Sequence, residues 1–379
     1  MADAPHLLFA ISNDFGELAN ALYFLSGQPL RANLLMPKRM LDLQGQSLPH
    51  AAAAYASAND IISAIRSQRP DAVLLFSGYL FGVNSLFDPP ALTRIVAEAG
   101  QVGARVASTD PFLGLLSRPV SPFHPGHPLA GRFTAHFGQV SLALRDVHHL
   151  YLCDPENLTS SLSSGFFNPN IITSRDEVAA TLGRYGYSSD GPPRWLFTLS
   201  GEDYAMQCNR FGADQFHQIA LGLFNQTTAH GRRPMFISPQ PLIGALQSLT
   251  RSPQDLNSAN ITAHAHDLFR ALIIDAEHVF YWNIFSNSIL ARVANRGPVF
   301  FFHEGHLPNA MPPVRQLGME RYYRGAPLPF LDAQRPLTLS TLSASAAAQP
   351  ALFAPALASF RHLATPAEVI RSLLGSPVP

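Results

Sequence analysis

The sequence predicts an α/β protein with two domains, each built on a parallel β-sheet. Short apolar runs alternate with stretches of helical spacing along most of the chain. Parallel strands must be joined by crossover connections, usually helices, so this alternation indicates open parallel sheets. The pattern is interrupted once near the middle, and a length of 379 residues corresponds to two domains of roughly 150 residues each.

The first half contains five expected strands and three expected helices. The strands are residues 6–12, 31–37, 71–77, 104–109 and 148–153. The helices are residues 18–25, 51–67 and 90–99. Residues 119–132 are rich in Pro, Gly and His, and we expect them to form an irregular insertion or a lid.

This first series ends in a region rich in breakers, where residues 188–193 read Ser-Ser-Asp-Gly-Pro-Pro. We therefore expect an N-terminal domain at residues 1–168, a linker at 169–193 and a C-terminal domain at 194–350. The second series has expected strands at 195–199, 235–238 and 260–263, and expected helices at 212–228, 241–249 and 268–274.

The stretch from Ile274 to His306 closes the second series. Residues 279–282 and 299–302 are apolar strands, and the helix between them begins at Ser286-Asn287-Ser288. The polar loops of such a unit fall at the carboxyl ends of its strands, where open parallel sheets bind ligands. The chain then continues with an expected loop at 307–329, an Ala/Ser tract at 340–349 and a last helix at 366–374.

The composition excludes several classes of partner and site. Charged residues make up 14% of the chain, below the roughly 25% usual in soluble domains. The 26 basic and 26 acidic residues balance, which gives no electrostatic argument for nucleic-acid binding. Cys153 and Cys208 are too few for a disulfide framework or a Cys-rich zinc site. Without a visible signal peptide or ~18 consecutive apolar residues, we expect a soluble cytoplasmic protein.

Ser286, Asn287 and Ser288 are the first candidate site. Unpaired N–H groups at a helix start carry roughly half a positive charge, and they bind anions without a basic residue. Together with the two hydroxyls, they would hold a phosphate or diphosphate. Ordinary helix capping uses the same chemistry and explains the cluster equally well.

His303, Glu304 and His306 follow the last expected strand. Glu304 would accept hydrogen bonds from sugar or ribose hydroxyls, and His303 would contact phosphate. The zinc motif His-Glu-x-x-His needs histidines one helical turn apart, whereas these lie three residues apart in a Gly-containing loop. We therefore expect no metal site here.

Ser200 and Gly201 form a further candidate in the loop Ser200-Gly201-Glu202-Asp203, which follows the first strand of the second half. Glycine would let the backbone approach a phosphate closely. A plain tight turn explains the loop equally well.

The order of elements, the Ser-rich helix start at Ser286 and the loop after the first strand resemble the GT-B glycosyltransferases. The order of strands and helices is similar over most of the chain, whereas few sequence motifs are shared. It implies two Rossmann-like domains facing a central cleft, with a nucleotide-sugar in the C-terminal domain and the acceptor in the N-terminal one. It also implies that the helix within 351–379 packs back on the N-terminal domain. His264 and His266, expected to point the same way from a strand, would contact the nucleobase.

The implied reaction transfers a sugar to an acceptor hydroxyl with inversion, with the nucleotide-sugar as co-substrate and no cofactor. Such a transfer needs a group that deprotonates the acceptor. Asp14, in the loop after the first strand, is the first choice, Glu17 is the second and Asp110 is their main rival. Helix capping also explains Asp14 and Glu17, and turn formation before a proline explains Asp110. The acceptor, whether a small molecule, a glycan or a protein, is not indicated.

Absent motifs narrow the choice further. No Gly-x-Gly-x-x-Gly follows the first strand, which disfavours an NAD site, and no Gly-x-x-x-x-Gly-Lys-Ser/Thr loop is present. No Asp-x-Asp ends a strand, which argues against a metal-dependent GT-A transferase. Two alternatives stay open: a sugar-nucleotide epimerase related to the UDP-N-acetylglucosamine 2-epimerases, and a non-catalytic scaffold that uses its sparsely charged surface to bind a partner.

Overall fold

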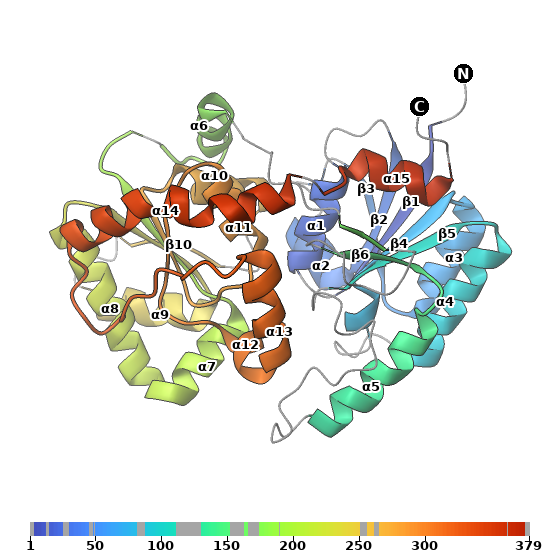
Figure 1. Cartoon of the computed structure of the whole chain (residues 1–379), viewed down its shortest axis with the longest axis horizontal. Coiled ribbons are helices and arrows are strands. Elements are labelled where there is room, and N and C mark those ends of the chain that lie inside the picture. Colours follow the sequence, from blue (N-terminus) through green and yellow to red (C-terminus); the bar gives the residue numbers. More distant parts are fainter. Residues whose placement is uncertain are drawn as a thin grey trace. The chain divides into compact units, whose positions relative to one another are not determined.

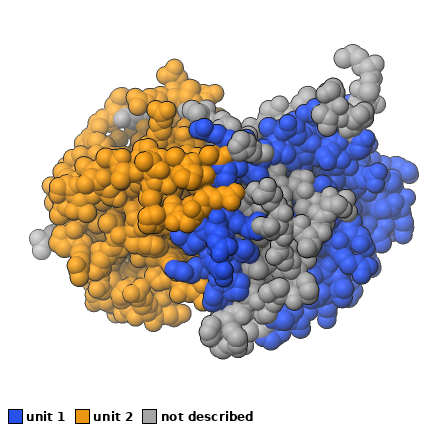
Figure 2. Space-filling view, viewed as in Figure 1, with its two compact units in different colours: residues 1–168, 310–322, 359–379 blue, residues 169–309, 323–358 orange. Residues whose placement is uncertain are grey.

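The computed structural model describes residues 4–12, 15–25, 30–44, 48, 50–81, 88–110, 130–151, 163–165, 174–188, 190–250, 256–260, 265–361 and 363–375. The chain divides into two compact units, which Figure 2 distinguishes by colour. Unit 1 contains residues 1–168, 310–322 and 359–379, and unit 2 contains residues 169–309 and 323–358. The domain limits expected at 168, 193 and 350 stay predictions.

Unit 1 is built on a parallel sheet whose seven described strands have the order β3-β2-β1-β4-β5-β6-β7. The strands are β1 His6–Ile11, β2 Arg31–Pro37, β3 Ala51–Tyr55, β4 Ala72–Phe76, β5 Arg105–Thr109, β6 His148–Tyr151 and β7 Ser163–Gly165. Every residue of β1 and β4 is buried, because both faces of a central parallel strand are covered.

Helices flank this sheet (Figure 1). They are α1 Phe15–Leu25, α2 Lys38–Gln44, α3 Ala58–Gln68, α4 Pro89–Gln101, α5 Ala130–Ala143 and α15 Pro366–Leu374. The short helices η2 Gly78–Leu80, α13 Pro312–Leu317 and η4 Gly318–Tyr322 also belong to unit 1. One apolar cluster joins alternate residues of β1, such as Leu7 and Phe9, to α1 and to Val369 and Ile370 of α15. The end of the chain therefore belongs to the core of unit 1.

Unit 2 contains a second parallel sheet, with the order β10-β9-β8-β11-β12. Its strands are β8 Arg194–Thr198, β9 Arg233–Ser238, β10 Asn257–Asn260, β11 His278–Tyr281 and β12 Val299–Phe301. Its helices are α6 Arg175–Arg184, α7 Gly201–Phe211, α8 Ala213–Ala229, α9 Gln240–Leu249, α10 His266–Asp275, α11 Asn287–Ala294, α12 His306–Ala310 and most of α14 Leu339–Phe360. On one face of the sheet, Phe197 stacks on Phe236 and Phe280 with ring centroids 4.7 and 4.8 Å apart.

The predicted α/β class with two parallel sheets is confirmed, and several single elements differ from the sequence expectation. Residues 51–55 form β3 rather than the start of a helix, because they pair with β2 and α3 begins only after a capping box at Ser57 and Asp60. The expected loop at 307–329 contains α12, α13 and η4. The Ala/Ser tract at 340–349 lies inside α14, since Ala has the highest helix propensity. In the part of the chain that the structure describes, no helix has the length and apolarity to span a membrane.

Candidate functional site

The candidate site lies at the carboxyl edge of the unit 2 sheet. β8 has β9 on one side and β11 on the other, so the crossovers that follow β8 and β11 run in opposite directions. Ligands of open parallel sheets bind at such a switch point. The residues that reach this point are those that follow β8, β11 and β12.

Asp203 joins these three segments through one buried carboxylate, which is 1% exposed. Its Oδ2 accepts from Ser200 Oγ at 2.8 Å and from Asn283 Nδ2 at 3.1 Å. Its Oδ1 accepts from the backbone N–H of His306 at 2.7 Å and lies 3.0 Å from His306 Nδ1. An ionised carboxylate only accepts, so Nδ1 carries the hydrogen.

The surroundings keep Asp203 ionised. Burial acts to raise the pKa of Asp203, but the hydrogen bonds and charge of His306 and the hydrogen bond of Ser200 outweigh it and hold that pKa below its ordinary value. A buried charge must be paired and hydrogen-bonded to persist. Asp203 therefore holds the segments after β8, β11 and β12 together through hydrogen bonds to an ionised carboxylate.

Gly305 allows the segments after β11 and β12 to approach closely. Its φ is +99°, and a Cβ at this position would lie 2.6 Å from Asn283 Cβ and 2.9 Å from Asn283 Cα. The residues adjacent to this pair are also bonded, because the backbone N–H of Ile284 donates to the backbone oxygen of Glu304 at 2.9 Å. Only glycine combines this backbone conformation with this proximity.

Ser286, Asn287 and Ser288 start α11, and Ser286 is its N-cap. Ser286 Oγ accepts from Ser288 N at 3.4 Å and lies 2.7 Å from Ser288 Oγ, which in turn lies 3.1 Å from the hydroxyl of Tyr281. The capping interpretation is therefore realised in the structure. Capping does not exclude a bound anion, because helix-start N–H groups serve both purposes, so phosphate binding stays a prediction.

His303 and Glu304, in the segment after β12, are half-buried. His303 Nδ1 accepts from the backbone N–H of Gly305 at 2.9 Å, which requires an unprotonated Nδ1. Burial lowers the pKa of His303, the charge of Arg210 lowers it further, and Asp203 and Glu304 act in the opposite direction. Both observations favour a neutral His303.

Ser200 is the N-cap of α7, accepting from Asp203 N at 3.1 Å, and Gly201 is the first residue of that helix. The expected loop is thus a helix start. His264 lies outside the described residues. The expectation that it shares a strand with His266 is wrong, because β10 ends at Asn260 and His266 begins α10.

The three acidic candidates belong to unit 1, where Asp14 lies outside the described residues. Glu17 is 3% exposed and Asp110 is 1% exposed. Glu17 Oε2 accepts from Thr109 Oγ1 at 2.5 Å, and Oε1 accepts from Asn20 Nδ2 at 3.2 Å. The structure thus brings Glu17 to the end of β5, where Asp110 follows Thr109, and buries both carboxylates.

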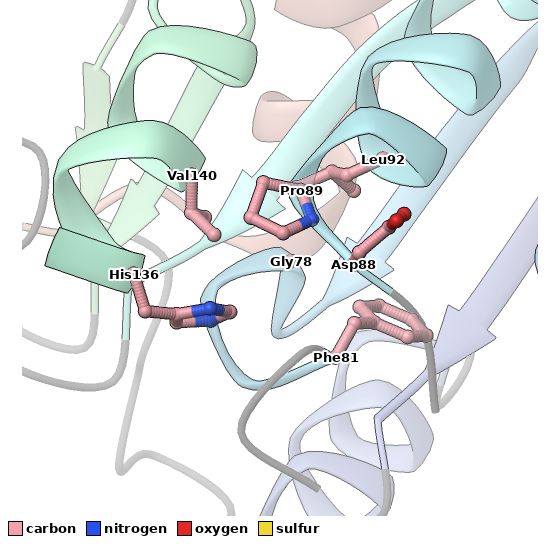
Figure 3. Close-up of a pocket in the computed structure, with 7 residues that line it drawn as sticks. All are labelled: Gly78, Phe81, Asp88, Pro89, Leu92, His136 and Val140. Carbon is pink, nitrogen blue, oxygen red and sulfur yellow. The ribbon is translucent and has the colours of Figure 1, made fainter. Parts of the chain in front are cut away.

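A small hollow in unit 1 is lined by Gly78, Phe81, Asp88, Pro89, Leu92, His136 and Val140 (Figure 3). It leaves no room for a water molecule, so we assign no ligand to it. Across the described ranges, no group of three or more His, Cys, Asp or Glu side chains is arranged to hold a metal ion.

Solved structures similar to the chain cover nearly its whole length. A UDP-glucosyltransferase from Polygonum tinctorium covers 100% of both chains at 11% identity, with a TM-score of 0.55. The UGT2 protein of Phytolacca americana, complexed with UDP-2-fluoro-glucose and pterostilbene, covers 98% of this chain and 94% of its own at 14% identity, with a TM-score of 0.51. The UDP-GlcNAc 2-epimerase of Neisseria meningitidis, bound to UDP-GlcNAc, covers 99% and 100% at 11% identity, also with a TM-score of 0.51.

The chain has a GT-B-like fold. Identities of 11–14% show the fold alone. No protein-family model matches the sequence, and no curated protein matches it.

Within this GT-B-like fold, sequence reasoning left out two members of the cluster, Asp203 and Asn283. The signal for Asp203 was its spacing from Ser200, since Ser followed three residues later by an acidic residue marks a helix start. Asn283 had no such signal, because its partner lies 80 positions away in the chain. The structure brings Ser200 and His306 into hydrogen-bond contact with Asp203 and His303 within reach of its charge. It places Ser286 at the start of α11.

Proposed function

We propose that the protein is a glycosyltransferase that moves a sugar from a nucleotide-sugar to an acceptor hydroxyl, with inversion and without a metal ion. The observation that carries this proposal is the convergence of the segments after β8, β11 and β12 on Asp203, at the switch point of the unit 2 sheet. The fold likeness supports it, since two of the similar structures are a UDP-glucosyltransferase and a complex with a UDP-sugar.

The donor would bind along this edge of unit 2. Ser286, Asn287 and Ser288 would hold the diphosphate at the start of α11, and Ser200 and Gly201 would add a second helix start, at α7. In the same proposal His303 contacts phosphate, Glu304 accepts from hydroxyls of the sugar or ribose, and the His264–His266 region contacts the base.

The first test is a thermal-shift screen of the full chain against nucleotides and sugar nucleotides. A ligand bound only by the native state raises its stability, so a hit is expected among them. Replacing Ser286 and Ser288 together with Ala should then weaken nucleotide binding about tenfold, as expected for lost hydrogen bonds to a charged group. Unchanged affinity would remove the phosphate site from the proposal.

Acceptor activation is assigned to Asp14. Glu17 and Asp110 are almost fully buried, which disfavours direct contact with an acceptor, so they remain second choices. We expect Asp14→Asn to lower kcat by about 10²–10⁴-fold, the usual contribution of a general base, and to leave donor affinity unchanged. Full turnover by this variant would show that the base lies elsewhere.

The likeness to a UDP-GlcNAc 2-epimerase supports a second candidate, a sugar-nucleotide epimerase. The two reactions separate without knowledge of the acceptor. An epimerase produces an isomerised nucleotide-sugar or free sugar from the donor alone, which NMR of the incubated donor detects. If no nucleotide or sugar nucleotide stabilises the chain, the scaffold alternative replaces both.

A further inference from the structure

The cluster around Asp203 is short of positive charge for the ligand proposed above. Lys38, in unit 1, is the only lysine of the chain, and residues 199–206, 282–288 and 302–306 contain neither Lys nor Arg. Within these three segments, only the helix starts and the histidines can offset the charge of a diphosphate. These histidines are His303 and His306, three residues apart in the segment after β12.

The two histidines make opposite hydrogen bonds at Nδ1. His303 accepts a hydrogen bond at Nδ1 from Gly305 N, and its pKa is lowered by burial and by Arg210, so it favours the neutral form. His306 instead donates from Nδ1 to the buried carboxylate of Asp203 at 3.0 Å. A neighbouring carboxylate favours the protonated imidazole.

His306 is also the group that faces solvent. Its side chain is 35% exposed, whereas that of Asp203 is 1% exposed. Among the residues that the structure describes, the charged and titratable groups around this corner are Asp203 and Arg210 on α7 and His303 and Glu304 in the segment after β12. Arg210 lies in the last turn of α7, with its guanidinium 4.8 Å from the ring centre of Phe211.

The segment that carries His306 is tied to the one that leads into α11. A Cβ on Gly305 would be within 3 Å of Asn283 Cα, and Ile284 N bonds Glu304 O at 2.9 Å. Ile284 stands two residues before the N-cap Ser286. The segment that carries His306 and the segment that leads into α11 are thus joined by a backbone hydrogen bond in unit 2.

We propose that His306, oriented and charged by Asp203, is the cationic ligand for the phosphate groups of the donor. This inference rests on the proposed function, because it assigns a role within the same nucleotide site. Asp203 acts through His306 and is a positioning residue. The imidazolium supplies a positive charge within residues 199–206, 282–288 and 302–306, which contain neither Lys nor Arg, and it does so only while His306 is protonated.

The test is calorimetric binding of UDP, ADP, GDP and inorganic pyrophosphate to the full chain between pH 6 and pH 9. His306→Gln should weaken binding about tenfold at pH 6.5, the effect of losing one charge-assisted hydrogen bond, and by less than about twofold at pH 9. The pH dependence of binding that remains in His306→Gln reports the titration of the phosphate groups themselves. His217→Gln, on α8, is the matched control and should leave the wild-type pH profile intact.

Asp203→Asn tests whether Asp203 acts on the protonation of His306, because a purely structural role of Asp203 would not shift the midpoint of the pH profile of binding. Losing the carboxylate charge should shift the midpoint of the pH profile down by about one unit, in protein shown to be folded by tryptophan fluorescence. An equal loss at both pH values in His306→Gln, or an unshifted profile in Asp203→Asn, overturns this inference and leaves the proposed function standing. If the wild type binds none of the four probes at any pH, the proposed function fails and this inference fails with it.

Discussion

His149, in β6 of unit 1, is held neutral by its surroundings. It is 4% exposed, its Nε2 lies 2.7 Å from the hydroxyl of Tyr79, and its ring stacks on Tyr151. Burial, with the charge of His148, lowers the pKa of His149 to about 4. In the unfolded chain histidine titrates at roughly 6.5, so the unfolded state binds the proton first as the pH falls. Unit 1 should therefore lose about 3 kcal/mol of stability between pH 6.5 and pH 4.

The His149→Gln variant isolates this contribution, because Gln keeps an acceptor for Tyr79 and does not titrate. The free energy of opening β4 and β6, measured by amide hydrogen exchange, should fall by about 2 kcal/mol less between pH 7.5 and pH 5 than in the wild type. His217→Gln in unit 2 serves as the control. An acid loss of the same size in His149→Gln and in the wild type would contradict the assignment.

At Gly305, the addition of a single Cβ atom is expected to change the stability of unit 2. In Gly305→Ala the new Cβ would meet the backbone of Asn283 at a φ of +99°. We expect unit 2 to lose about 1–3 kcal/mol, from backbone strain and displacement of the segment after β11. Trp195 and Trp282 are the only tryptophans of the chain and both lie in unit 2, so urea unfolding followed by their fluorescence reports on this unit.

Gly222→Ala in α8 is the matched control for Gly305→Ala. Its Cβ would meet no atom within 4 Å, and replacing glycine by alanine inside a helix should stabilise unit 2 by about 0.5–1 kcal/mol. Opposite signs for the two substitutions are expected. A neutral result at Gly305 would mean that the close approach to Asn283 is not needed.

At the level of elements, Arg292 of α11 holds the opposite edge of the unit 2 sheet together. Its guanidinium donates to Ile273 O at 3.1 Å, Ile274 O at 2.7 Å and Glu277 O at 2.9 Å. These carbonyls end α10 and precede β11, where a helix leaves acceptors unsatisfied. Burial lowers the pKa of Arg292 to about 10, so it stays charged at neutral pH.

We expect Arg292→Met to cost unit 2 about 2–4 kcal/mol, because several buried carbonyls lose their donors at once. Arg292→Lys should cost less, since an ammonium still serves part of the set. Tryptophan-monitored urea unfolding measures both variants. Equal losses would show that the packing of the side chain matters more than its hydrogen bonds.

Elements with strong local signals were predictable from the sequence, whereas elements set by distant partners were not. The apolar runs at β1, β4 and β8 identify their strands, because such runs are buried on both faces. Ala51–Tyr55 favours a helix by propensity, but pairing with β2 makes it a strand. The same distinction holds for the candidate site. The Ser286 cap could be predicted from neighbouring residues in the sequence. The contact between His306 and Asp203 could not, because 103 positions separate the two residues.

At the level of the whole molecule, the chain leaves unit 1 and returns to it twice, ending in α15. Val369, Ile370 and Leu373 of α15 are 1%, 3% and 7% exposed and lie in the core cluster of unit 1. Burying side chains of this size stabilises by about 1.5–3 kcal/mol each, against a typical domain stability of about 5–15 kcal/mol. The last helix therefore carries a large part of the stability of unit 1.

A chain that ends at Leu363 keeps α14 and lacks α15, which isolates this contribution. We expect β1 and β4 to lose most of their hydrogen-exchange protection, while the tryptophan transition of unit 2 serves as an internal reference. A synthetic peptide of residues 364–379 added to the shortened chain should restore protection in proportion to its concentration, because a segment that binds only the folded form stabilises it by mass action. The same peptide with Ile370→Asp should fail, since a buried carboxylate would replace an apolar contact. If the shortened chain keeps full protection of β1 and β4 without the peptide, α15 packs on unit 1 without contributing to its stability.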